Sequence, residues 1–78
     1  MQIEIITPDK KLFSGNASSV QFPGTDGSFG VKNNHAAMIS TLKKGQIKLT
    51  TEQNTVEVFE INGGVVEVLA NKIIVLAE

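Results

Sequence analysis

Apolar and polar residues alternate along most of this chain, in short stretches separated by residues that favour turns. Residues 2–6 alternate in this way and are followed by a turn signal at residues 7–9. Residues 46–50 place Ile47 and Leu49 on one face and polar side chains on the other. Because successive side chains of a strand point to opposite faces of a sheet, this pattern predicts half-buried β-strands.

Turn-forming residues recur every several positions and leave no stretch with a helical pattern of ordinary length. Gly, Pro, Asn, Asp and Ser gather at residues 14–16, 23–27 and 62–64, where we expect the chain to turn or break its strands. The sequence therefore predicts an all-β fold of about eight to ten short strands, arranged as an antiparallel sandwich or barrel. No repeat, low-complexity tract or linker divides the chain, so we expect a single domain over residues 1–78.

Two stretches leave a choice of structure. Residues 35–42 fit one helical turn or a broken strand, and we expect a strand because residues 39–42 are rich in β-branched side chains. Residues 73–77 are almost entirely apolar. A strand of that kind is expected in the middle of a sheet, buried on both faces.

The longest expected strand, residues 55–61, changes its apolar face part-way along. The alternation favours Val56 and Val58 at first and then Phe59 and Ile61. An extra residue inserted into one strand shifts the alternation in this way, so the pattern predicts a β-bulge.

The composition indicates a folded domain and gives no support to several classes of function. Hydrophobic residues make up 41% of the 78 residues and charged residues 19%, a balance that favours a globule over disorder. A formal net charge of −1 and the absence of Tyr and Trp argue against nucleic-acid binding. Without Cys there is no disulfide or thiolate metal site, and we expect no signal peptide and no membrane span.

Residues that could carry chemistry are sparse. His35 is the only histidine and no serine lies in a nucleophile motif, so we interpret His35 as a loop or interface residue. The Gly-rich stretch 24–30 lacks the spacing of a nucleotide-binding loop and is interpreted as a turn that leads into a strand. Glu57 and Glu67 alternate with valines and are expected on solvated outer faces. The residues alone thus indicate a β domain that binds an unidentified partner.

Four motifs stand in order and at suitable spacing along nearly the whole chain. They are Thr7-Pro8 with Leu12-Phe13-Ser14-Gly15; Phe22-Pro23-Gly24-Thr25-Asp26-Gly27 with Phe29-Gly30-Val31 and His35-Ala36; Leu42-Lys43-Lys44-Gly45-Gln46-Ile47-Lys48; and Gly63-Gly64-Val65-Val66-Glu67-Val68 with Asn71 and Val75-Leu76-Ala77. In these motifs the chain resembles the N-terminal β domain of the epsilon subunit of F-type ATP synthases. Each motif alone is weak, but the ordered set is specific.

The resemblance implies a fold and a place in a larger machine. The fold would be a flattened antiparallel β-sandwich of about ten short strands. The chain would be a non-catalytic subunit of the rotor, which couples the membrane c-ring to the gamma subunit in proton- or sodium-driven ATP synthesis. It would use no cofactor or metal and bind no nucleic acid. It would reach the cytoplasmic face of the inner membrane only through the complex, as a peripheral protein.

Positions that match the family's contact surfaces are implied to bind these partners. The turn Asp26-Gly27-Ser28 is implied to contact the c-ring. A coupling interface that uses one sheet face requires an apolar surface patch larger than a free monomer usually exposes. The residues implied to bind the gamma subunit are Thr7, His35, Met38, Ser40 and Asn62.

Two departures from the family pattern affect these expectations. Ala37 stands where the family usually has proline. The family commonly continues into two helices after the apolar ending, whereas this sequence stops at Glu78. On that ground we expect no inhibition of ATP hydrolysis by a helical arm.

Three other functions compete with this interpretation. A small nucleic-acid-binding barrel of the OB or cold-shock type has a similar length, but it would need surface aromatics and a basic face. A β-rich hydrolase would have to use His35. A sugar-binding or adaptor sandwich from another family would need, for sugar recognition, the aromatic platforms that this chain lacks.

Overall fold

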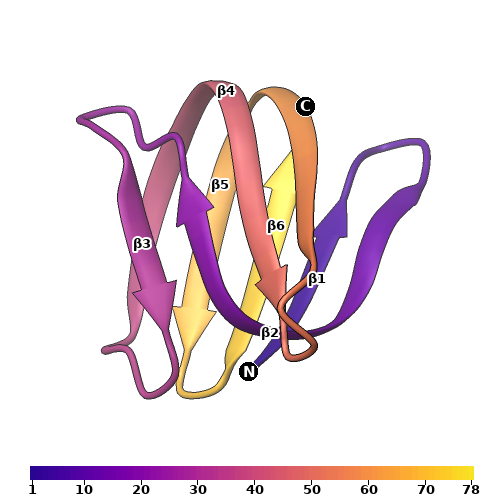
Figure 1. Ribbon diagram of the computed structural model, residues 1–78. Coiled ribbons are helices and arrows are strands. Elements are labelled where there is room, and N and C mark those ends of the chain that lie inside the picture. The colour runs from indigo at the N-terminus through magenta and orange to yellow at the C-terminus, as the bar shows by residue number, and fades with distance from the viewer.

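Six β-strands joined by turns and loops make up the chain, and no helix is present (Figure 1). The computed structural model describes residues 1–78. Buried and exposed residues alternate along the strands, as the apolar pattern predicts. The strands are β1 (Gln2–Ile6), β2 (Lys11–Phe22), β3 (Phe29–Lys32), β4 (Met38–Thr51), β5 (Val56–Leu69) and β6 (Lys72–Ala77).

Hydrogen bonds join the strands into a single sheet that closes on itself. The strand order is β1-β6-β5-β4-β2-β3, and a further pairing of β1 with β2 completes the closure. The sheet is flattened into two layers, with overall extents of 27 × 24 × 18 Å. The expected all-β sandwich is thus confirmed. The expectation that all strands pair antiparallel is wrong for one pair, because β1 runs parallel to β6.

The two longest strands, β4 and β5, bend and take part in both layers (Figure 1). They keep one register along their whole pairing. In β4 the buried side chains change parity between Leu42 and Ile47, and in β5 between Ile61 and Val66. A bent strand therefore resembles two short strands in the sequence. For this reason the expected count of about ten strands is wrong and the structure has six.

The bend in β5 lies at two glycines, later than the alternation of residues 55–61 suggests. Gly63 and Gly64 have φ of +144° and +149°. Beside them, the Asn62 N–H donates to the Glu78 carbonyl and the Glu78 N–H donates to the Gly63 carbonyl, both at 2.9 Å. Two successive residues of β5 thus face one residue after β6, which is the geometry of a bulge.

Three further expectations need correction. Val56 and Val58 face outward rather than toward the core, because the parity of β5 changes only at the glycines. The strand expected over residues 35–42 begins at Met38, since a turn at residues 33–34 precedes it. β6 is central in the sheet as expected, but Leu76 is 57% exposed, so this strand is not buried on both faces.

One apolar core lies between the two layers. No polar or charged residue is buried. Burial of a single aliphatic side chain contributes about 1.5–3 kcal/mol, so this cluster is the main source of stability. Phe13 and Phe59 extend the core at one side in an edge-to-face pair, with ring centroids 5.8 Å apart. The fifteen core residues are Ile3, Ile5, Ala17, Val20, Phe22, Val31, Leu42, Ile47, Leu49, Ile61, Val66, Val68, Ile73, Val75 and Ala77.

Candidate interaction surface

The outer side of one layer carries a set of apolar side chains that no other part of the chain covers. This layer consists of β1, β6, the second half of β5 and the first half of β4. We call its outer side the outer apolar face. Its apolar members, none of which is fully buried, are Ile6, Ile39, Val65, Leu69, Ile74 and Leu76.

Strand register places these side chains in rows across the layer. One row runs from Ile6 on β1 to Leu76 on β6 and Val65 on β5. It ends at Thr41 on β4, the register partner of Val65. Because register partners in neighbouring strands point to the same side of a sheet, the row forms a continuous apolar strip.

A second row lies beside the first and mixes apolar and acidic residues. It contains Glu4, Ile74, Glu67 and Ile39, one from each strand. Ile39 is the most exposed of the large hydrophobic residues, at 71%. Scattered exposed hydrophobics are normal, but neighbouring ones on one face mark an interaction surface.

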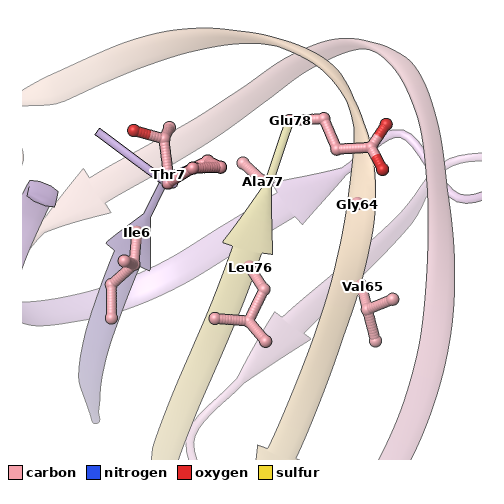
Figure 2. A pocket seen from close by; sticks show the side chains of 8 residues that line it. Ile6, Thr7, Gly64, Val65, Leu76, Ala77 and Glu78 are labelled. Atoms are coloured by element: carbon pink, nitrogen blue, oxygen red, sulfur yellow. The ribbon is translucent and has the colours of Figure 1, made fainter. Parts of the chain in front are cut away.

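A shallow hollow of about 450 Å³ lies where the outer apolar face meets the bent end of the sheet. Figure 2 shows Ile6, Leu76 and Val65 on three neighbouring strands at its wall, with Thr7 and Glu78 at its upper rim. The wall is mostly apolar and the rim polar. A hollow of this kind accepts a side chain of a partner protein better than a charged small molecule.

The residues expected to bind the gamma subunit lie at different parts of the domain. Thr7 lines the hollow, and its hydroxyl is held in a turn by the backbone of Lys10 at 3.0 and 3.1 Å. Asn62 is exposed at the bend and bonds to Glu78, another residue of the hollow. The structure therefore brings Thr7 and Asn62 into one neighbourhood.

The other expected positions are less accessible or lie elsewhere. Met38 and Ser40 are half-buried on β4, and Met38 packs against the core. His35 follows the turn at residues 33–34, where the Asn34 N–H donates to Asn71 Oδ1 at 3.3 Å. That contact places His35 near the β5–β6 turn, at the end of the layer opposite the bend.

The turn expected to contact the c-ring projects into solvent beside the bend. Asp26, Gly27 and Ser28 are all exposed. The Gly27 N–H donates to the Gly24 carbonyl at 3.0 Å, and Gly24 forms a bridge to Leu42 at the bend of β4. The turn is thus held at the same end of the domain as Thr7 and Asn62.

The chemical groups weighed in the sequence do not assemble into a reactive site. His35 Nδ1 lies 2.8 Å from the Ala36 carbonyl, and no hydrogen bond joins it to a serine. No three residues of the types His, Cys, Asp and Glu come together as a metal site would require. Glu67 lies on the outer face as expected, but Glu57 shares the inward side of β5 with Phe59 and is half-buried.

Comparison with known proteins identifies the family. The model of the ATP synthase delta/epsilon chain β-sandwich domain matches residues 1–78. The chain belongs to this family. It is an epsilon-type chain, which makes it a non-catalytic subunit of the central stalk of ATP synthase.

Curated relatives agree with this assignment along the whole sequence. The epsilon-type chain is 40% identical over 77 residues to the ATP synthase epsilon chain of Chlorobium limicola, covering 99% of this chain and 88% of the relative. It is 44% identical over 78 residues to the epsilon chain of Sulfurimonas denitrificans, covering 100% of this chain and 60% of that relative.

Solved structures show the same fold at lower sequence identity. A chain of the Euglena gracilis mitochondrial ATP synthase superposes with a TM-score of 0.90 at 16% identity, over 96% of the epsilon-type chain and 48% of its own length. A chain of the Tetrahymena thermophila mitochondrial ATP synthase central stalk and c-ring gives a TM-score of 0.82 at 23% identity, over 99% and 62%. The epsilon-type chain has no helix with the length and apolar character needed to cross a bilayer.

The sequence did not reveal the two most exposed apolar residues of the outer apolar face. Leu76 lies in an apolar run that suggests complete burial, and Ile39 lies in a stretch of uncertain structure. The signal that could have found Leu76 is its place in the alternation along β6. Ile73 and Val75 are buried, so Leu76 must face the opposite side of the sheet.

Proposed function

We propose that the epsilon-type chain links the gamma subunit to the membrane c-ring and transmits rotation between them. In this proposal residues 1–78 act as one β-sandwich domain. The domain sits as a peripheral protein on the cytoplasmic face of the inner membrane and serves ATP synthesis driven by protons or sodium ions. Membership of a central-stalk family supports the proposal.

The outer apolar face is the observation that carries the proposed contact with the gamma subunit. A specific protein interface buries on the order of 800 Å² on each partner. A domain of 78 residues can supply that area only by giving most of one sheet face to the partner. The exposed Leu76 and Ile39 and the hollow beside Thr7 are the features that such a partner would cover.

We assign the residues of this contact as the family resemblance implies. Thr7 and Asn62 would contact the gamma subunit at the bent end of the layer. Met38 and Ser40 would contact it along β4, and His35 at the far end. This assignment requires the gamma subunit to lie along the length of the layer, because Thr7 and His35 are at opposite ends.

The turn at residues 26–28 is the proposed contact with the c-ring. Its side chains are short and exposed, so a loop of the ring can approach its backbone closely. Its position at the bent end, held by the bridge between Gly24 and Leu42, gives it a fixed orientation relative to the outer apolar face. A rigid, closely packed domain between the two contacts can transmit torque with little deformation.

Site-directed cross-linking tests both contacts, because the chain has no cysteine of its own. We expect single-cysteine variants N62C and H35C to cross-link to the gamma subunit in the assembled synthase, and S28C to cross-link to the c-ring. The control is Q53C, at the exposed turn between β4 and β5, which should cross-link to neither. Cross-linking of Q53C with equal yield, or of S28C to the gamma subunit alone, would contradict the assignment.

A further inference from the structure

The first half of β4 has a neighbouring strand on one side only. Its residues pair with β5 from Met38 to Leu42. On the other side, the segment 23–25 bonds to the upper part of this stretch: the Thr25 N–H donates to the Thr41 carbonyl at 3.0 Å, and the Lys43 N–H donates to the Pro23 carbonyl at 2.9 Å. Segment 23–25 therefore pairs with β4 for a short stretch, where a further strand would lie, and then turns away.

Strand geometry shows which groups are left free below this segment. In an antiparallel ladder the N–H and C=O of one residue point to the same side, and successive residues alternate between sides. Because Thr41 and Lys43 point toward segment 23–25, Ile39 points to that same side. No strand pairs there and no loop bonds to the backbone of Ile39. Its N–H and C=O are thus both unpaired at the edge of the sheet.

The side chains beside this unpaired backbone are an exposed apolar residue and an acidic residue. Ile39 is 71% exposed on the outer apolar face. Its register partner is Glu67, which lies between Ile39 and Ile74 and is half-buried. The structure has one salt bridge, between Lys11 and Glu4, so Glu67 has no cationic partner within the chain.

We propose that the free edge of β4 at Ile39 binds an extended segment of the gamma subunit, which pairs with it through main-chain hydrogen bonds and carries a basic side chain beside Glu67. This inference depends on the proposed function, because it specifies how the gamma subunit is bound. An extended main chain presents a donor and an acceptor at the spacing that Ile39 offers.

Two features of the structure favour this occupant over a simple apolar contact. An incoming segment would continue the hydrogen-bonded ladder that segment 23–25 already begins, so the backbone of β4 is preset in the geometry that pairing needs. The unpaired Glu67 carboxylate selects a cationic side chain on that segment, which gives the contact a charge preference as well as a register.

Amide hydrogen exchange gives a direct test at single residues. In the free chain we expect the Ile39 amide to exchange rapidly and the Ser40 amide, which points toward β5, to be protected. When the purified gamma subunit is added in excess, exchange at Ile39 should slow by about tenfold or more, because its N–H becomes hydrogen-bonded. Unchanged exchange at Ile39 in a saturated complex would overturn the proposal.

Substitutions at the edge separate the backbone contact from the side-chain contact. I39P removes the N–H that faces away from β5, and proline is tolerated at an edge strand when its N–H side faces solvent. We expect I39P to bind the gamma subunit about tenfold more weakly, while the matched control I39T, which keeps the N–H and the β-branched shape, weakens binding about threefold or less. E67Q should weaken binding about two- to fivefold and reduce its dependence on salt.

The possible results distinguish this inference from the proposed function. If the parent chain binds the gamma subunit and I39P binds equally well, the edge pairing is wrong and the proposed function stands. If the folded parent chain shows no binding to the gamma subunit, the proposed function and this inference both fail. If the Ile39 amide becomes protected at high chain concentration and stays unprotected with the gamma subunit, the occupant is a second copy of the chain and the proposal is overturned.

Discussion

Gly64 is the residue on which the two-layer arrangement depends most directly. A Cβ atom at this position would collide with the carbonyl oxygen of Leu76 and lie 3.0 Å from the Ala77 Cα. Its φ of +149° is also one that L-residues rarely adopt. Both the lack of room for a Cβ atom and the positive φ therefore require glycine here. Its small size allows β6 to approach the bend of β5 closely.

Replacing this glycine should destabilise the fold. We expect Gly64→Ala to lower the free energy of unfolding by about 2–4 kcal/mol, since the added methyl group meets backbone that has no free space to move into. Urea denaturation followed by circular dichroism measures this loss. Gly30→Ala is the matched control: its nearest contact would be the Val20 carbonyl at 3.9 Å, so a change below about 1 kcal/mol is expected. Equal losses in the two variants would show that the bend does not depend on Gly64.

At the scale of elements, strands of the same sheet differ sharply in how many neighbouring strands hold them. β6 lies between β1 and β5, and three of its six residues are core members. β3 has four residues, pairs only with β2 and forms an edge of the sheet. Local stability follows the number of paired sides and the buried apolar contacts, so these two strands represent the extremes of the fold.

Native-state hydrogen exchange should resolve this difference. We expect the hydrogen-bonded amides of β6 to exchange only through global unfolding, and those of β3 to exchange at least about tenfold faster through local opening. Low concentrations of denaturant provide the control, because they accelerate global exchange more than local exchange. If β3 and β6 exchange at the same rate, the sheet opens as one unit and the contrast is wrong.

At the scale of the whole molecule, the outer apolar face dominates the expected interaction. The surface otherwise carries eight acidic residues and seven lysines, with a formal net charge of −1. Because these charges nearly cancel, long-range electrostatic steering contributes little to the rate of association with a partner. Association with the gamma subunit should therefore be governed mainly by burial of apolar area, with the Glu67 contact as a smaller contribution.

Calorimetry can measure this burial. We expect binding to the gamma subunit to show a negative heat-capacity change, since apolar surface leaves water. Leu76→Asp should make the change smaller and weaken binding at least about tenfold, because an exposed leucine at the centre of the face becomes charged. The free variant should keep its stability to within about 1 kcal/mol, as the side chain is mostly outside the core. Unaltered affinity would remove Leu76 from the contact.

The sequence predicts the fold class and most of the core, because those depend on alternation between neighbouring residues. The count of strands was wrong since Gly63 and Gly64 interrupt the alternation without ending β5. The parallel pairing of β1 with β6 depends on contacts between residues far apart in the chain, which local patterns do not encode. The family likeness supplied Thr7 and Asn62 as a possible contact, but the free edge at Ile39 followed only from the observed pairing.

The pairing of the first strand with the last also has a kinetic consequence during protein synthesis. Ile3 and Ile5 leave the ribosome early, yet their partners Ile73 and Val75 are made some seventy residues later. Until then the nascent polypeptide holds β-forming segments with one side unpaired, and the sheet can close only after translation has passed residue 77. Closure of the sheet is therefore timed by the synthesis of β6.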